Sequence, residues 1–297
     1  MNDPAVVAAT SRDAFDRLLG DIRPKLHRYC ARMTGSVIDG EDVVQDALIK
    51  ALEAFPSAGA IVQPEGWLFR VAHNATLDFL RRRTRQALIQ SDEDPEMMVD
   101  PVTVLQDREI AATSLRTFMR LPVVQRSSVI LMDVLGYSLQ DIGEMMDATI
   151  PAVKANLHRG RARLRELAVE PDDAPAPVMT EHDRALLTAY IDRFNARDVD
   201  AVRSMLAEEV RLDLVSRQQL VGSEVSKYFV NYSKTHDWLL VPGMVDGRAA
   251  ALVRDPHDPT GNPIYFVLLD WRIDKVIRIR DFRYARYAIE GAALLVF

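Results

Sequence analysis

The chain has 297 residues, 48% of them hydrophobic and 27% charged, so it is long enough for two or three folded domains and is not disordered throughout. Its formal net charge of −6 at pH 7 means that any nucleic-acid surface must be local, with acidic residues elsewhere. One cysteine excludes an internal disulfide, no spaced Cys and His set suggests a metal or other cofactor, and the lack of an apolar signal or membrane-length run predicts a cytoplasmic protein without a membrane partner.

Residues 12–88 are predicted to form a wholly helical block. Apolar residues recur there at helical spacing, and we expect Pro24 to restart the first helix and Gly35 to end it. After a break at Asp39 and Gly40, the segment EDVVQDALIKALEAF has a second helical pattern. The loop FPSAGAIVQPEG then precedes a helix over WLFRVAHNATLDFLRRRTRQ.

Two helical faces in this block carry groups that suit a partner. The segment EDVVQDALIK has an acidic face with an exposed isoleucine, which suits a basic helix: Asp42, Gln45, Asp46 and Ile49. The helix after the loop combines aromatic, amide and charged groups of the kinds that stack on bases and contact phosphates: Trp67, Asn74, Asp78, Arg81, Arg82 and Arg83. The alternatives are an ordinary solvated face, a core tryptophan, and arginines that only complement the helix dipole.

Residues 89–108 are rich in acids and contain prolines, which predicts a flexible linker. A second helical block follows over residues 109–170. Within it, residues 136–165 have the pattern of a helix-turn-helix, with Ser138 as the N-cap of the first helix and Thr149 as the N-cap of the second.

The second helix of this motif has a predicted buried side of Val153, Leu157 and Leu164. Its opposite side is cationic and no acidic residue interrupts it: Lys154, Asn156, His158, Arg159, Arg161, Arg163 and Arg165. Such a face suits phosphates, and the first turns of the helix can reach base edges in a major groove. The alternative is an exposed helix whose arginines are merely solvated.

A Pro-rich linker over residues 171–180 precedes a region, residues 181–297, in which helical patterns give way to alternating ones. Two helices are predicted near the start of this region and another over GSEVSKYFVNYSK. Alternating segments such as VRLDLV, NPIYFVLLDWRI and KVIRIRDFRYA are predicted to be strands of a curved antiparallel sheet. Helices followed by strands indicate an α+β domain.

Three segments carry a resemblance to a known family: EDVVQDALIKAL, WLFRVAHNATLDFLRRR and LPVVQRSSVILMDVLGYSLQDIGEMMDATIPAVKANLHRGRARLRE. They resemble the two domains of extracytoplasmic-function (group 4) sigma factors of bacterial RNA polymerase, over roughly residues 12–168. The resemblance implies sigma region 2 over residues 12–88 and sigma region 4 over residues 109–170. It also implies a subunit that is not an enzyme, binds core RNA polymerase and directs initiation at promoter DNA.

The resemblance implies a role for each candidate face. The acidic set with Ile49 would face the clamp helices of the largest polymerase subunit. The set from Trp67 to Arg83 would lie at the minus-10 element. The minus-35 element would be faced by Ala152, Lys154, Ala155, Asn156, Arg159 and Arg161. The family usually has a basic or small polar residue in place of Asn156, and the loop FPSAGAIVQPEG lacks its usual polar residues, so no promoter sequence is inferred.

Residues 181–297, especially YIDRFNARDVDAVRSMLAEEVRLDLV, resemble the SnoaL-like branch of the NTF2-like cone fold. The whole architecture implied is two all-α sigma domains followed by an α+β NTF2-like cone domain. Relatives of this fold hold small molecules, so the resemblance implies a built-in regulator with a small molecule as a candidate ligand. The pocket candidates are Asp213, His236, Tyr265 and Trp271, although nothing in their spacing brings them together.

Two other classes of protein stay open. A ligand-responsive helix-turn-helix regulator explains the cationic helix, but it does not need the acidic helix at residues 41–52 or the arginine cluster at residues 81–85. Co-purification with core polymerase separates the two. A SnoaL-like enzyme fused to a DNA-binding module predicts turnover that is lost when His236 or Asp213 is changed, and it fails if these two residues lie apart.

Overall fold

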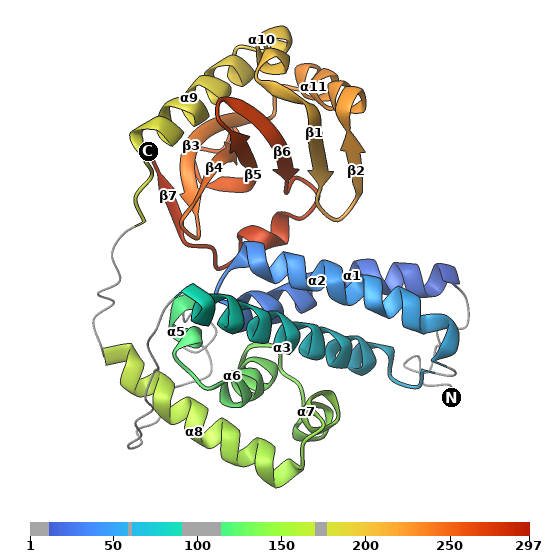
Figure 1. Ribbon diagram of the computed structural model, residues 1–297. Helices are drawn as coiled ribbons and strands as arrows, with labels where there is room; N and C mark the ends of the chain where they lie inside the picture. Colours follow the sequence, from blue (N-terminus) through green and yellow to red (C-terminus); the bar gives the residue numbers. More distant parts are fainter. Residues whose placement is uncertain (1–11, 59–60, 91–113, 170–176) are drawn as a thin grey trace. The chain divides into compact units, whose positions relative to one another are not determined.

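The computed structural model describes residues 12–58, 61–90, 114–169 and 177–297. The chain divides into two compact units, Met1–Asp173 and Ala174–Phe297, and each is described by itself (Figure 1). Most of the linker expected over residues 89–108 and the first part of the one expected over residues 171–180 lie outside the described residues. No described helix is long and apolar enough to cross a membrane.

The first unit opens with α1 (Arg12–Thr34), a single continuous helix. Pro24 lies inside it, so the prediction that Pro24 restarts the helix is wrong. Ile22 and Leu26 are buried on either side of the proline, and this packing holds the helix together where the proline removes one backbone hydrogen bond. Gly35, with a φ of 79°, ends the helix as predicted.

The second helix, α2 (Val37–Ala54), begins earlier than expected. Ser36 caps it by accepting hydrogen bonds from two backbone N–H groups, so Asp39 and Gly40 lie within the helix and the predicted break there is wrong. A Cβ at Gly40 would lie 2.6 Å from the backbone nitrogen of Ala31 in α1. The glycine therefore permits close packing of two helices rather than ending one.

A short 3-10 turn (Phe55–Ser57) and a loop lead to α3 (Pro64–Gln90), which packs against α1 and α2. The remaining helices of this unit are α5 (Leu115–Met119), α6 (Val123–Val129), α7 (Leu139–Met146) and α8 (Ile150–Val169). A π-helical turn (Ile130–Val134) extends α6, and Gly136 follows it with a φ of 77°.

The two helical blocks of this unit share one hydrophobic core. Phe15, Tyr29 and Phe69 from the first block belong to the same buried cluster as Phe118 and Ile142 from the second. Across the boundary, α5 packs against α1 and α7 packs against α3. The helix-turn-helix and α3 are therefore parts of one compact body in this structure.

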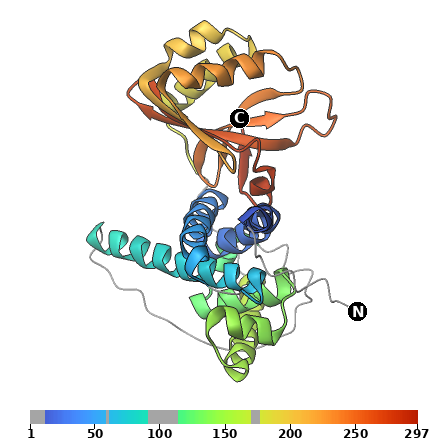
Figure 2. The same cartoon turned by 90° about the vertical axis from the view of Figure 1, so that its right-hand side faces the viewer.

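The second unit contains α9 (Glu181–Asn195), α10 (Val199–Ser204) and α11 (Ser226–Ser233), all on one side of a curved sheet (Figure 2). The strands are β1 (Leu206–Leu214), β2 (Gln218–Val221), β3 (Leu239–Val245), β4 (Arg248–Arg254), β5 (Pro263–Arg272), β6 (Lys275–Asp281) and β7 (Leu294–Val296). The predicted order of helical domains followed by an α+β domain is confirmed.

The sheet has the order β2-β1-β6-β5-β4-β3-β7. β1 and β6 run parallel, with Leu212 opposite Ile279, so the prediction of an antiparallel sheet is wrong for this pair, whereas the other pairs are antiparallel. The parallel pair forms because a helix and four strands intervene between β1 and β6, a connection long enough to cross over. The edge strands β2 and β7 are short and largely exposed, and their sequences lack the alternation that predicts a strand.

Candidate nucleic-acid interface

Local caps hold the helix-turn-helix of α7 and α8. Ser138 and Asp141 form a reciprocal capping box at the start of α7. Asp147 adopts a left-handed conformation with a φ of 51° in the turn, and the Oγ1 of Thr149 accepts a hydrogen bond of 3.4 Å from the backbone N–H of Ala152. Both predicted caps are confirmed, so the direction of α8 is set by residues within its own motif.

The cationic face of α8 is open to solvent over its first turns. Val153, Leu157 and Leu164 are buried as predicted. On the other side are exposed or half-buried groups: Ala152, Lys154, Ala155, Asn156, His158 and Arg159. Within the described parts of the chain, no acidic side chain pairs with Lys154 or Arg159; the guanidinium of Arg159 instead donates to Asn156 Oδ1 at 3.1 Å.

Two arginines further along α8 are engaged within the unit. Arg161 Nε donates to Asp133 Oδ2 at 2.9 Å, and the Asp133 side chain is only 1% exposed. Arg163 pairs with Glu166 at 2.8 Å. Because a buried carboxylate needs its counter-charge, Arg161 anchors α8 to the π-helical turn that extends α6. Arg165 is half-buried, so the exposed cations without an acidic partner in the described part of α8 are Lys154 and Arg159, in its first three turns.

Gly160 is a structural residue of this helix that the sequence pattern did not single out. A Cβ at this position would lie 2.8 Å from Val129 Cγ2 and 3.2 Å from the carbonyl oxygen of Gln125. The glycine therefore lets α8 approach α6 closely. The only sign of this close packing in the sequence was a glycine within an otherwise helical pattern.

The arginines at the end of α3 are exposed, and each lies near an acidic residue. The pairs are Arg81 with Asp78 at 3.6 Å, Arg82 with Asp46 at 3.7 Å, and Arg83 with Asp39 at 3.7 Å. The pairs of Arg81 and Arg82 are exposed on both sides, and exposed pairs of this length contribute at most about 1 kcal/mol, so a phosphate group can compete for these two arginines. Arg83 also donates to the carbonyl of Thr34 at 3.0 Å, which fixes its position.

The other candidates on α3 differ in exposure. Asn74 is exposed, and Asp78 is exposed one helical turn further on. Trp67 is half-buried, with its ring 6.1 Å from that of Phe15, which in turn stacks on Phe55 at 4.0 Å. The indole is therefore held against the core at the start of the helix, and the polar groups follow along its exposed side.

The acidic face of α2 lies beside the end of α3. Ile49 is 48% exposed, which is unusual for a large apolar side chain, and Asp46 is exposed next to it. Asp42 and Gln45 are half-buried on the same face. Sequence reasoning missed the neighbouring Glu41, which is fully buried and receives a hydrogen bond of 3.1 Å from Arg23 Nε.

A buried arginine joins the two helical blocks. Arg126 of α6 is 4% exposed and donates to the carbonyl oxygens of Met33 at the end of α1 and of Met119 and Leu121, the last two at 3.1 and 2.9 Å. Burial lowers the pKa of Arg126 to about 10, so it remains charged at neutral pH. Nothing in the sequence distinguished this arginine from the exposed ones.

Three buried side chains form a second polar link between the blocks. The hydroxyl of Tyr29 lies 2.7 Å from His73 Nδ1 and 2.8 Å from Ser127 Oγ. Burial lowers the pKa of His73 to about 4 and raises the pKa of Tyr29, so both are neutral at pH 7. Helices α1, α3 and α6 thus meet at a neutral hydrogen-bonded group.

The four pocket candidates of the second unit do not come together. Asp213 pairs with Arg278 and Arg280 of β6, at 3.7 and 3.8 Å. His236 is exposed just before β3, and three strands separate β3 from β1, which carries Asp213. The remaining two candidates lie elsewhere: Tyr265 is buried on β5, and Trp271 packs edge-on against Tyr190 of α9, with ring centroids 6.4 Å apart.

A tyrosine and aspartate cluster that sequence reasoning missed lies inside this unit. Asp281 is fully buried, and its Oδ2 accepts a hydrogen bond of 2.7 Å from the hydroxyl of Tyr232. That hydroxyl also lies 3.1 Å from the hydroxyl of Tyr265. Burial raises the pKa of Asp281 above its usual value and the pKa of Tyr265 to about 12.

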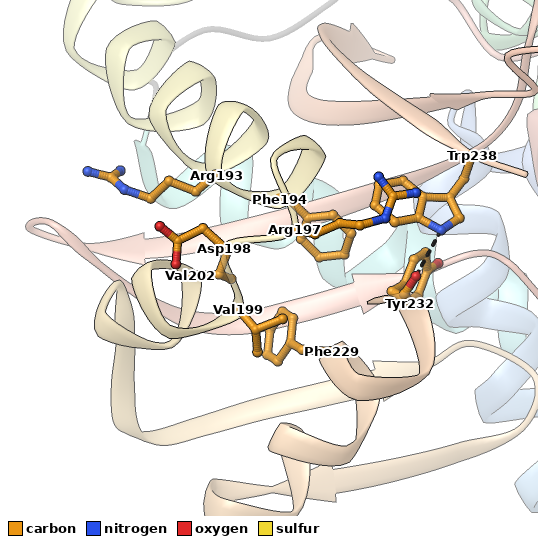
Figure 3. A pocket seen from close by; sticks show the side chains of 9 residues that line it. All are labelled: Arg193, Phe194, Arg197, Asp198, Val199, Val202, Phe229, Tyr232 and Trp238. Atoms are coloured by element: carbon orange, nitrogen blue, oxygen red, sulfur yellow. Dashed lines mark hydrogen bonds between the residues drawn. The ribbon is translucent and has the colours of Figure 1, made fainter. Parts of the chain in front are cut away.

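The interior at the end of α9 is filled by aromatic rings (Figure 3). Phe194 and Trp238 pack edge-to-face at 5.2 Å, and the guanidinium of Arg197 lies 4.7 Å over the indole of Trp238. The indole N–H donates to the carbonyl of Tyr232 at 3.2 Å. A cavity of only about 10 Å³ is left, too small for a ligand.

Neither unit, in its described residues, has a group of three His, Cys, Asp or Glu side chains suited to a metal ion.

Comparison with known proteins identifies both helical blocks. Residues 18–86 match the model of sigma-70 region 2, and residues 115–164 match the model of sigma-70 region 4. The chain is 34% identical to the ECF RNA polymerase sigma factor SigM of Mycobacterium tuberculosis over 167 residues, which cover 55% of this chain and 81% of that protein.

Two further matches extend into the second unit. The ECF RNA polymerase sigma factor SigG of Mycobacterium tuberculosis is 24% identical over 94% of this chain and 86% of its own length. A crystal structure from Kribbella flavida, named for a ketosteroid isomerase, is 26% identical and covers 34% of this chain and 77% of its own, with a TM-score of 0.27.

The two matched regions occur in the order expected of one sigma factor, and the match to SigM covers most of that protein. The chain belongs to the extracytoplasmic-function family of RNA polymerase sigma factors.

Proposed function

We propose that this sigma factor contacts the minus-35 element through α8, the minus-10 element through α3, and core polymerase through α2. The observation that carries the proposal is the exposed face on the first turns of α8. Lys154 and Arg159 have no acidic partner among the described residues there, while the small side chains of Ala152 and Ala155 leave space for base edges. Arg161 holds the helix in place through Asp133.

The roles proposed for α3 and α2 rest on chemistry that complements DNA and protein. Arg81 and Arg82 form weak exposed pairs, and the side chain of Arg83 is more than half exposed, so all three are available to phosphates of the melted strand. The acidic residues of α2, together with the exposed Ile49, suit a helix with basic and apolar groups, as expected of the clamp helices.

Run-off transcription with core polymerase and a library of randomised promoters tests the assignment. Asn156→Ala is expected to relax the base preference at one or two positions of the minus-35 element, because a group that contacts a base edge carries sequence information. The matched control is Arg163→Ala, which removes a side chain already paired with Glu166. An unchanged preference in Asn156→Ala, or an equal change in the control, would contradict the proposed reading surface.

We further propose that the second unit regulates the sigma unit. It has its own sheet, helices and buried interior, so it is not needed to complete the helical core. A protein that ends at residue 173 should give promoter output different from that of the full chain in the same assay. Identical transcription from both proteins would contradict a regulatory role.

A further inference from the structure

A second cavity of the C-terminal unit is lined by residues of α11, of β1 and β2, and of the end of β6 and the turn after it. Helix α11 and the strands β1 and β2 lie beside one another in the ribbon (Figure 1). Its volume is about 330 Å³, compared with about 10 Å³ at the aromatic-filled end. Ligand pockets for small molecules begin at about 300 Å³, so this space suits a molecule of one or two rings. None of the residues singled out from the sequence as pocket candidates lines it.

The walls of this cavity are apolar and aromatic. Leu214 and Leu220 contribute from the strands, Tyr228 and Tyr232 from α11, and Tyr284 from the turn after β6. Tyr284 is 46% exposed, and the guanidinium of Arg217 lies 4.4 Å over its ring, which holds the ring in place. Walls of this kind favour a flat apolar body, because aromatic rings pair edge-on or offset.

The lining of the cavity has two basic side chains and one acidic side chain. Lys227 and Arg283 are cations, and no acidic side chain in the described chain pairs with Lys227. Arg283 lies 5.0 Å over the ring of Tyr232, and its nearest carboxylate, that of Asp237, is 3.9 Å away. The lining therefore has one free cation and one weakly paired cation for a ligand.

The single acidic residue of the lining is already satisfied. Asp281 accepts the hydroxyl of Tyr232 at 2.7 Å on one oxygen and the backbone N–H of Arg283 at 2.8 Å on the other. Burial also raises the pKa of this carboxyl above its usual value. The electrostatic preference of the cavity is therefore set by the two cations.

We propose that this cavity binds a small aromatic carboxylate. The ring would lie between the leucines and Tyr284, and the carboxylate would bond to Lys227 and Arg283. A carboxylate fits better than a dianionic group, because only one of the two cations is without a partner. This inference is independent of the promoter-contact roles, since the cavity lies wholly in the unit Ala174–Phe297.

Isothermal titration of the full chain with benzoate, 2-naphthoate and indole-3-acetate tests the proposal. The neutral 2-naphthamide has the ring of 2-naphthoate without its charge. We expect at least one carboxylate to bind, and 2-naphthoate to bind about tenfold more tightly than the amide, as a charge-assisted hydrogen bond implies. Absence of binding by all three carboxylates at about 5 mM, or equal affinity for the amide, would overturn the proposal.

Two variants locate the site. Lys227→Met should weaken carboxylate binding about tenfold, and Tyr284→Ala about fivefold, through loss of the charged group and of the aromatic wall. The control is Lys234→Met, an exposed lysine outside the lining. Circular dichroism and thermal unfolding check that each variant is folded; Tyr284 is exposed enough to be changed without loss of the fold. Binding that is unchanged in both Lys227→Met and Tyr284→Ala would place the ligand elsewhere, for instance on the cationic α8, and would overturn the proposal.

Discussion

Helices α3 and α8 both contain runs of basic residues, yet their cations have different surroundings. On α3, each of Arg81, Arg82 and Arg83 has an acidic neighbour, two of them on α2. On the first turns of α8, Lys154 and Arg159 have no acidic partner in the described chain. From their composition alone, the basic residues of the two helices would be expected to be equally available to an anion.

The difference arises from what each helix packs against. The polar side of α2 lies along α3, and the inner side of α3 carries His73 in contact with Tyr29. The inner side of α8 is apolar and meets α6 through Gly160. The first turns of α8 are therefore open to an anion because no carboxylate pairs with their cations, whereas Arg161 further along is paired with Asp133.

The strongest test of the buried polar links is Arg126. Arg126→Met should lower the free energy of unfolding of the helical unit by about 3 kcal/mol, because hydrogen bonds to three buried carbonyl groups are lost. Urea unfolding followed by hydrogen exchange in peptides from α1 and α6 measures this unit alone. Arg116→Met, at an exposed site on α5, is the control. If both variants lose the same free energy of unfolding, the hydrogen bonds of buried Arg126 do not stabilise the helical unit.

His73 makes the same region sensitive to acid. Its pKa is lowered from 6.5 to about 4 in the folded state, so its contribution is fully present above pH 6.5 and is lost as the pH falls towards 4. The loss should reach about 3 kcal/mol for the helical unit, since each pKa unit corresponds to about 1.4 kcal/mol. His73→Gln should reduce this pH dependence, whereas His158→Gln, at an exposed site on α8, should retain it. Urea unfolding followed by hydrogen exchange, repeated at several pH values, measures this dependence. If the free energy of unfolding depends on pH equally in His73→Gln, this histidine is not the cause.

The open surface of α8 is tested by the salt dependence of promoter binding. Lys154→Ala and Arg159→Ala should each weaken binding of the polymerase holoenzyme about fivefold and reduce the slope of log affinity against log salt by about 0.9. Arg163→Ala should change the slope little, because Glu166 already neutralises this arginine. Fluorescence anisotropy over a range of salt concentrations measures both quantities. Equal slopes in all three variants would show that ion pairing does not distinguish these cations.

The smallest expected effect is at the seam between α2 and α3. Asp46→Asn breaks an exposed pair with Arg82 and should change the free energy of unfolding by less than about 1 kcal/mol. It should nevertheless weaken binding to core polymerase if the acidic face is the docking surface. Glu53→Gln, also exposed on α2, is the control for loss of one charge. Equal polymerase affinity in both variants would remove Asp46 from the proposed contact.

Much of the helical unit could be predicted because its signals are local. The caps at Ser138 and Thr149, the buried stripe from Val153 to Leu164 and the exposure of Ile49 all follow from residues a few positions apart. The errors at Pro24 and Gly40 have the opposite origin. Residues that break an isolated helix were kept within one by packing between α1 and α2.

In the candidate sites, too, local features could be predicted from the sequence and contacts between distant residues could not. The positions of the cations along α8 were readable from the sequence, but the pairing of Arg161 with Asp133, 28 residues earlier, was not. In the C-terminal unit, Tyr265 was singled out as a pocket residue, whereas its neighbours Tyr232 and Asp281 were not. These three residues come from α11, β5 and β6, so no short spacing could associate them.

By itself, the sequence determined the order of the domains, the helix-turn-helix with its caps, the family and the cationic side of α8. Hydrogen bonds and apolar contacts within four residues produce the caps and the two sides of α8, and the family and domain order follow from sequence segments read one after another, so none of these needs the contacts between distant residues. Only the tertiary structure decided which arginines are paired, that β1 runs parallel to β6, and that a cavity with two cations lies beside α11. Each of these depends on contacts between residues far apart in sequence, whose partners are selected by the packing of the whole unit.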